Sequence, residues 1–170
     1  MADNALCRTA DSTLLLYPNA REPRTYRIPD GITAISAYAF YDCDLLESVV
    51  VPDSVTQLPA RAFSGCSALT GIRIPAAITE IINHTFSGCT SLATLEIPDS
   101  VTKIGDYAFL GCTLLTSIAI PDSVTAIGNG AFSNCTALTL TVTPDSYAAE
   151  YAQANNIPYT YPDANDWLYN

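Results

Sequence analysis

Hydrophobic and polar residues along this chain follow a pattern that returns every 23 residues. Residues 92–114 contain one copy, and identical residues recur at the same offsets before and after it. Four columns share this register: Phe40, Phe63, Phe86, Phe109 and Phe132; Cys43, Cys66, Cys89, Cys112 and Cys135; Leu46, Leu69, Leu92, Leu115 and Leu138; and Pro29, Pro52, Pro75, Pro98, Pro121 and Pro144. A fixed period of this size predicts a solenoid, in which each repeat forms one turn.

Each repeat is predicted to contain two short extended segments and one helical turn. Leu95 and Ile97 alternate with polar neighbours, as in a half-buried strand. Pro98 ends this strand because proline cannot donate a ladder hydrogen bond. Val101 and Ile104 then return the chain to the core as a second extended segment. The Ala-Phe-x-x-Cys segment that follows suits one helical turn with a buried face.

A single repeat cannot fold alone, because it buries too little apolar surface to offset the entropy of ordering its backbone. Stacked repeats share strands and core, and the two ends of the stack must be covered. The sequence therefore predicts one domain over residues 1–170. Its parts are an N-terminal cap at 1–28, five repeats at 29–144, a C-terminal helix–strand cap at 145–162 and a tail at 163–170.

Both caps have their own sequence pattern. Residues 14–17 and 26–28 flank a charged, proline-containing loop, which predicts a hairpin at the N-terminal end. At the last repeat, Leu140 and Val142 are apolar, although the period would place Thr141 and Thr143 inward. This strand is therefore predicted to be offset by one residue, before a helix capped by Asp145 or Ser146. Whether Trp167 docks on this cap stays open.

The repeat motif resembles the BspA-like class of leucine-rich repeats. The motif L-x-x-[IVL]-x-[IV]-P-x-x-[VI]-x-x-[IL]-x-x-x-A-F-x-x-C covers roughly residues 28–144, with local departures at Ala76, Ile82 and Thr85. The resemblance implies an α/β fold: a right-handed leucine-rich-repeat solenoid, rich in β-structure, with one short helical turn per repeat. Members of this class lie on bacterial and some protozoal cell surfaces, and some bind host proteins or other cells.

Composition narrows the range of partners. The net charge of −10 repels nucleic acid and anionic membrane surfaces. No apolar run approaches the roughly 18 residues of a membrane span, so membrane insertion is not expected. Met1–Asn4 is polar and acidic, unlike a secretory leader. We expect an extracellular or cell-surface part of a larger multidomain protein, with a cytoplasmic chain as the alternative.

The cysteine column predicts buried free thiols. Five of the six cysteines recur with the period and would point inward in parallel, about one rung of 4.8 Å apart. That spacing slightly exceeds the Cβ separation that a disulfide requires. No C-x-x-C motif occurs and His84 is the only histidine, so neither a metal site nor a cofactor is expected. Cys7 lies outside the column, and its role stays open.

The first candidate site is the outward side of the first strand of each repeat, here called the strand face. Its side chains are mostly small and form a flat surface, which leucine-rich repeats commonly use to bind protein. Arg73 and Glu96 are one rung apart and are expected to pair. The candidate ligand-binding residues are Ser48, Val50, Arg73, Thr94, Glu96, Ser117 and Ala119. The alternative is a solvated sheet face without a partner.

A second candidate is an outward column that we call the aromatic column. It consists of Tyr38, Tyr41, Arg61, His84, Tyr107 and Leu110. Exposed tyrosine and arginine are common at protein interfaces, and tyrosine rings also stack on sugars. Ordinary amphipathic surface is the alternative.

A third column is acidic: Asp30, Asp53, Asp99, Asp122 and Asp145. Stacked carboxylates are compatible with Ca²⁺. However, most of these aspartates follow a proline and precede a serine, where side chain-to-backbone turns are favoured. We therefore expect turns and no metal.

The sequence contains no nucleophile motif, phosphate loop or Cys–His pair with catalytic spacing, so no catalytic residues are predicted. The favoured hypothesis is a non-catalytic extracellular recognition module that binds a protein ligand in adhesion at a bacterial surface. One alternative is a carbohydrate-binding accessory module, with a surface glycan on the tyrosines. A second alternative is a structural spacer.

Overall fold

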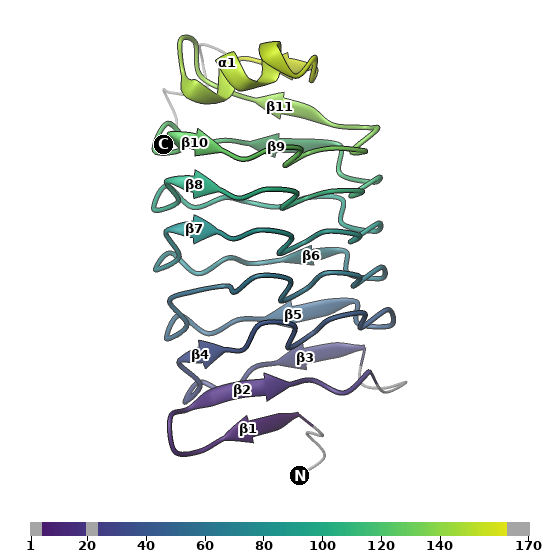
Figure 1. The fold of residues 1–170 in the computed structure, drawn as a ribbon, viewed down its shortest axis with the longest axis vertical. Coiled ribbons are helices and arrows are strands. Elements are labelled where there is room, and N and C mark those ends of the chain that lie inside the picture. Colours follow the sequence, from purple (N-terminus) through teal and green to yellow (C-terminus); the bar gives the residue numbers. More distant parts are fainter. Residues whose placement is uncertain (1–4, 20–23, 163–170) are drawn as a thin grey trace.

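The chain forms a solenoid of about six turns that ends in one short helix (Figure 1). The computed structural model describes residues 5–19 and 24–162. The predicted tail at 163–170, with Trp167, lies outside these residues. The solenoid predicted from the 23-residue period is confirmed.

Each turn contributes one rung to the strand face and one to a second face. The strand-face elements are β3 (Thr25–Arg27), β5 (Ser48–Val50), β6 (Gly71–Ile72), β9 (Ser117–Ala119), β11 (Thr139–Thr141) and β12 (Tyr159–Thr160). The second-face elements are β2 (Thr13–Leu16), β4 (Ala34–Ile35), β7 (Glu80–Ile81), β8 (Lys103–Ile104) and β10 (Ala126–Ile127). Neighbouring rungs pair in parallel, as Ser48 with Gly71 and Ile81 with Ile104.

The N-terminal hairpin differs from the predicted one. It joins β1 (Leu6–Arg8) to β2, whereas residues 14–17 and 26–28 were expected to pair. β2 instead stacks on β4 of the second face, and β3 stacks on β5 of the strand face. Directly after β2, the Tyr17 side chain is buried at 5 % exposed, and its N–H donates to Ala39 O on the next turn at 2.7 Å. The segments β2 and β3, which lie in the predicted N-terminal cap, therefore already form part of a turn of the solenoid.

The predicted helical turn of each repeat is a series of tight turns. Cys112 N–H donates to the Phe109 carbonyl at 3.1 Å, three residues back, as in a 3₁₀ turn. Tyr107 and Gly111 have φ of +53° and +74°, which interrupts any regular helix. Phe109 N–H donates to Ala131 O at 2.8 Å on the next turn of the solenoid, which replaces the intrahelical bond. Among the described residues, the one helix is α1 (Tyr147–Ala154).

The phenylalanine column forms a continuous stack through the centre of the core. Neighbouring rings from Phe40 to Phe132 lie 4.9 to 5.7 Å apart between centroids, with interplanar angles of 2° to 15°. Tyr17 extends the stack at one end, with its centroid 5.4 Å from that of Phe40. Tyr151 of α1 closes the other end, edge-on to Phe132. The predicted inward position of these rings is confirmed.

The cysteine column hydrogen-bonds to the phenylalanine column. The Cys66 thiol donates to the Phe40 carbonyl at 3.0 Å, and the Cys89 thiol donates to the Phe63 carbonyl at 3.1 Å. Cys112 and Cys135 repeat this contact with Phe86 and Phe109. Each of these four thiols thus satisfies a carbonyl of the preceding repeat, and the structure describes no disulfide. Cys43, Cys66, Cys89 and Cys112 are buried, whereas Cys135, on the last turn, is half-buried.

The C-terminal cap has the predicted offset. Leu140 and Val142 are buried, and Leu140 pairs with Ile118, 22 residues earlier. Ser146 caps α1 by accepting a hydrogen bond from Ala149 N–H at 3.2 Å. The Tyr151 hydroxyl donates to Gly128 O at 3.3 Å, which fastens the helix to the last turns.

Replacing Phe86 by alanine is expected to lower the free energy of unfolding by about 3–5 kcal/mol, as for other buried phenylalanines. Phe86 is fully buried in the middle of the stack, so its loss leaves a cavity against both neighbouring rings. Urea unfolding measures the effect. Leu114→Ala, at a side chain that is 56 % exposed, is the matched control and should change little. A Phe86→Ala midpoint equal to that of the control would contradict the stack.

Thiol titration with DTNB at pH 8 should separate the buried from the accessible cysteines. Burial raises the pKa of Cys43 to about 11 and that of Cys89 to about 12, so their reactive thiolates are scarce at pH 8. Burial also raises the pKa of Cys66. We expect all six thiols to react in denaturant, but only Cys7 and, more slowly, Cys135 in the native protein. Rapid reaction of four or more thiols in the native protein would show that the cysteine column is accessible to solvent.

Candidate functional site

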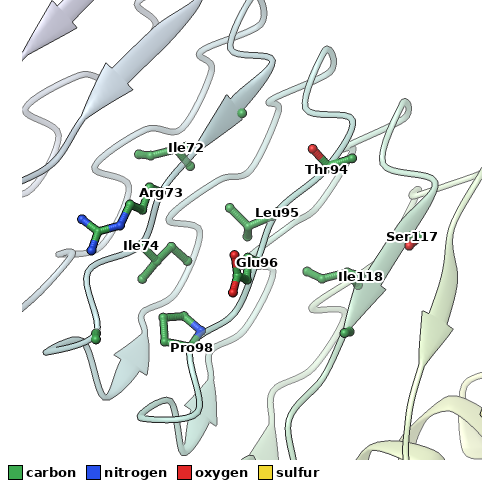
Figure 2. Close-up of a pocket in the computed structure, with 12 residues that line it drawn as sticks. Ile72, Arg73, Ile74, Thr94, Leu95, Glu96, Pro98, Ser117 and Ile118 are labelled. Carbon is green, nitrogen blue, oxygen red and sulfur yellow. The ribbon is translucent and has the colours of Figure 1, made fainter. Parts of the chain in front are cut away.

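The strand face contains a groove across three successive rungs (Figure 2). It encloses about 720 Å³ and is formed by residues of the segments 71–76, 94–98 and 117–119. Five of the seven predicted strand-face residues line it: Arg73, Thr94, Glu96, Ser117 and Ala119. Ser48 and Val50 lie on β5, the rung next to the groove, and do not line it.

The groove exists because the ladder of the strand face is interrupted. At one end of the solenoid Ile28 N–H donates to Val50 O at 3.0 Å, and at the other end Ile120 N–H donates to Thr141 O at 3.0 Å. Within the described chain, no corresponding bond joins Ile74 to Glu96 O or Ile97 to Ala119 O. The strands of this face consequently form one sheet of β3, β5 and β6 and another of β9, β11 and β12, and an isolated parallel bridge between Thr94 and Ser117 joins the middle rung of the groove to the second sheet.

Core side chains form the floor of this groove. Ile72 and Leu95 are each 7 % exposed, and Ile74 and Ile118 line the groove beside them. At the corresponding inward positions of the strand face outside the groove, Val49 is 2 % exposed and Leu140 is fully buried. Figure 2 shows Ile72, Leu95 and Ile118 side by side from three rungs. The sequence pattern assigns these residues to the core, so it could not identify them as part of a site.

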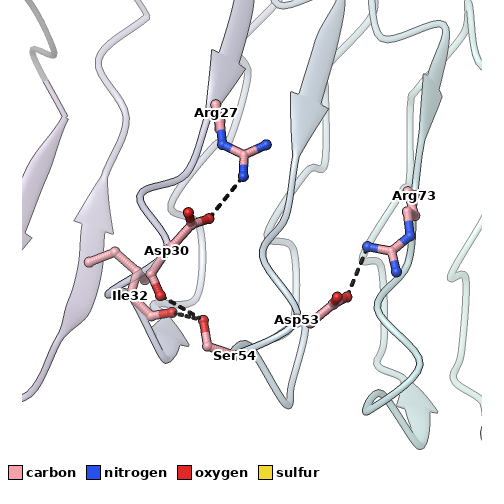
Figure 3. Close-up of polar contacts among 6 residues, drawn as sticks. All are labelled: Arg27, Asp30, Ile32, Asp53, Ser54 and Arg73. Carbon is pink, nitrogen blue, oxygen red and sulfur yellow. Dashed lines mark hydrogen bonds and ion pairs between the residues drawn. The ribbon is translucent and has the colours of Figure 1, made fainter.

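The expected pair between Arg73 and Glu96 does not form. Arg73 Nη1 instead lies 2.8 Å from Asp53 Oδ1 in the turn of the preceding repeat, and its side chain extends away from Glu96 (Figures 2 and 3). Asp53 was expected to serve the turn, but its carboxylate is 73 % exposed and within reach of Arg73. Glu96 is exposed and has no ion pair among the described residues. The groove therefore carries one uncompensated negative charge.

The aromatic column lies along one line of the solenoid, with an unusual backbone conformation. Tyr38, Arg61, His84 and Tyr107 have φ of +63°, +58°, +59° and +53°, and the next residue of the column, Gly130, has +58°. Bulky side chains rarely adopt this left-handed conformation, which glycine tolerates without cost.

Side chains of the aromatic column contact one another. The rings of His84 and Tyr107 stack with centroids 5.2 Å apart, and those of Tyr38 and Tyr41 meet edge to face at 5.6 Å. On its other side the Tyr107 ring packs against Gly130, where an added Cβ would lie 2.7 Å from Cε1. Tyr107 thus presents mainly its edge and hydroxyl to solvent.

Two further members of the aromatic column, Arg61 and Leu110, are half-buried. Partial burial, followed by the charge of Arg61, lowers the pKa of His84, while Asp106 opposes this shift. The lowered pKa favours the neutral imidazole, which suits the stacking of His84 on Tyr107.

Side chain-to-backbone hydrogen bonds were expected from the aspartates of the acidic column. The structure shows such bonds from the serines that follow three of these aspartates. Ser54 Oγ donates to Ile32 O at 2.6 Å in the preceding repeat (Figure 3). Ser100 and Ser123 repeat this bond with Ile78 and Val101 at 2.7 Å. Asp30 pairs with Arg27 at 3.0 Å. In the described residues, no group of three or more histidine, cysteine or acidic side chains is arranged to hold a metal ion.

Millimolar Ca²⁺ is expected to leave the melting temperature unchanged within about 1 °C, because a ligand stabilises a fold only where it binds. Differential scanning fluorimetry across a Ca²⁺ titration tests this, with Mg²⁺ as the ionic-strength control. A rise that continues with Ca²⁺ concentration and disappears in Asp99→Asn would identify the acidic column as a metal site.

The eight residues of α1, the helix that the structure describes, are too few to cross a bilayer.

Comparison with known proteins identifies the repeat. The sequence model of the BspA type leucine-rich repeat region matches residues 19–149 in six copies. The match begins before residue 29, in agreement with the stacking of β3 on β5. No curated protein matches the chain in sequence.

Solved structures of bacterial leucine-rich repeat proteins share both fold and sequence. A leucine-rich cell surface protein of Faecalibacterium prausnitzii A2-165 is 40 % identical over 92 % of this chain, with a TM-score of 0.73. A leucine-rich repeat protein of Bacteroides ovatus is 33 % identical over 79 % of this chain, with a TM-score of 0.69. A leucine-rich repeat protein of T. pallidum is 30 % identical over 81 %, with a TM-score of 0.70. The matches span 37 %, 36 % and 67 % of those three chains.

Proposed function

Because this chain belongs to the BspA-type leucine-rich repeat family, we propose that it is a non-catalytic recognition module that binds a protein ligand through its strand face. One observation carries the proposal: the strand face opens into a groove whose floor is made of aliphatic core side chains, with Ile72 and Leu95 each 7 % exposed, and whose backbone includes groups without ladder partners. Both are features that a protein surface can bury and satisfy. A solvated sheet face without a partner would need neither.

We place this activity outside a bacterial cell, in adhesion or a related surface contact. The support is the F. prausnitzii relative, which is described as a cell surface protein and is 40 % identical. Because that match spans 37 % of its length, the activity of any larger protein containing this chain is part of the proposal.

The geometry gives less support to a carbohydrate-binding module. Sugar recognition by tyrosine needs an open ring face, but His84 and Gly130 occupy the two sides of the Tyr107 ring. Tyr38 and Tyr41 contact each other edge to face. The aromatic column therefore offers ring edges and hydroxyls, which suit a protein contact better than a sugar platform.

Binding to a panel of defined extracellular proteins and soluble polysaccharides tests the proposal. Thr94→Lys with Ala119→Lys places two long side chains across the groove, at positions that are exposed and outside the core. We expect this variant to lose protein ligands by about tenfold or more, since blocked contact at an interface centre costs at least 1.4 kcal/mol. Biolayer interferometry measures the change.

Two further variants complete the design. Thr56→Lys with Thr79→Lys adds the same charge at exposed threonines near β7 and should retain binding. Tyr38→Ala with Tyr107→Ala removes the exposed rings. If only polysaccharides bind the wild type, and only the tyrosine variant loses them, the strand face is not the site. If no ligand of either class binds, the spacer hypothesis is preferred.

A further inference from the structure

The groove also specifies the chemistry of its ligand, an inference that rests on the proposed function. We propose that the groove binds an extended protein segment in which an aliphatic side chain is followed within two residues by lysine or arginine. The aliphatic side chain covers the floor at Ile72 and Leu95, and the cation pairs with Glu96.

The lining of the groove selects an aliphatic group. None of its twelve residues is aromatic, and its floor consists of Ile72, Ile74, Leu95 and Ile118, with Pro98 at one edge. Branched aliphatic side chains fill such a surface by close packing, whereas a sugar would leave its hydroxyls facing apolar carbon atoms. Three rungs span about 10 Å, the length of about three residues of extended chain.

The charges on the groove favour lysine or arginine as the second side chain of the bound segment. The cation on the groove, Arg73, already has a partner in Asp53 at 2.8 Å. Glu96 has no ion pair among the described residues, and the chain as a whole carries a net charge of −10. A basic side chain is therefore attracted both at long range and at the groove, while an acidic segment is repelled.

The backbone selects an extended segment. Ile74 N–H and the carbonyls of Arg73 and Glu96 have no ladder partner within the described chain. A peptide backbone carries both donors and acceptors, which such unpaired groups require. Aliphatic, cationic and backbone contacts then lie within a single three-rung site.

Selection from a displayed library of random 12-residue peptides tests this inference. Against the wild-type protein we expect enriched peptides to contain an aliphatic residue with lysine or arginine one or two positions later. Against Glu96→Arg the basic residue should be replaced by aspartate or glutamate. Glu80→Arg makes the same change at an exposed glutamate of β7 and should return the wild-type consensus.

Fluorescence anisotropy with the synthetic consensus peptide gives the magnitudes. Glu96→Gln should weaken binding by about fivefold, the effect of one partly exposed ion pair. Gly71→Thr should also weaken binding, because it extends a side chain into the groove; its Cβ would lie 3.9 Å from Thr94 O, so folding should be unaffected. Gly31→Thr makes the same change in an exposed turn away from the strand face, where an added Cβ meets nothing within 4 Å, and should bind as the wild type does.

The outcomes distinguish this inference from the function on which it rests. If Gly71→Thr abolishes binding but the consensus contains no basic residue, the charge assignment is wrong and strand-face recognition stands. If enriched peptides are unaffected by Gly71→Thr and Glu96→Gln, or if no peptide is enriched, the groove is not a peptide site. Sedimentation showing a dimer that Glu96→Arg dissociates would make a second copy of this chain the occupant and overturn the inference.

Discussion

The contact on which this solenoid depends joins each phenylalanine to the turns on both sides of it. In the middle of the stack, Phe86 N–H donates to Ala108 O on the next turn, and the Phe86 carbonyl accepts the Cys112 thiol. Its ring lies between those of Phe63 and Phe109. A fully satisfied, fully buried layer therefore fixes the spacing and register of the turns, because buried backbone groups without partners are costly.

That layer explains how the strand face can be open. Among the described residues, the ladder hydrogen bonds that would join Ile74 to Glu96 O and Ile97 to Ala119 O are absent, yet the turns that carry these residues remain stacked through the phenylalanine layer and the second face. Repeat proteins distribute their stability over contacts between neighbouring turns. One face can consequently lose some of its ladder bonds and present core side chains to a ligand.

The sequence predicted the features that depend on period and pattern, and missed those that depend on tertiary geometry. The period placed Phe86 and Cys89 correctly, and the apolar pattern revealed the one-residue offset at Leu140. It did not show that Tyr107 would adopt a left-handed conformation, because propensity disfavours it there. Nor did spacing along the chain indicate that Arg73 would reach Asp53, 20 residues earlier, since long side chains choose among several nearby acids.

The left-handed residues of the aromatic column have a further consequence for how such a protein can vary. At Tyr38, Arg61, His84 and Tyr107 the backbone would accommodate glycine with less strain, as Gly130 does one turn further on. The identity of each side chain is therefore nearly independent of the core that carries it. Along this row of four positions, one per turn, glycine and residues without a β-branch can replace one another with little demand on the core, so new surfaces can evolve or be engineered on the same framework.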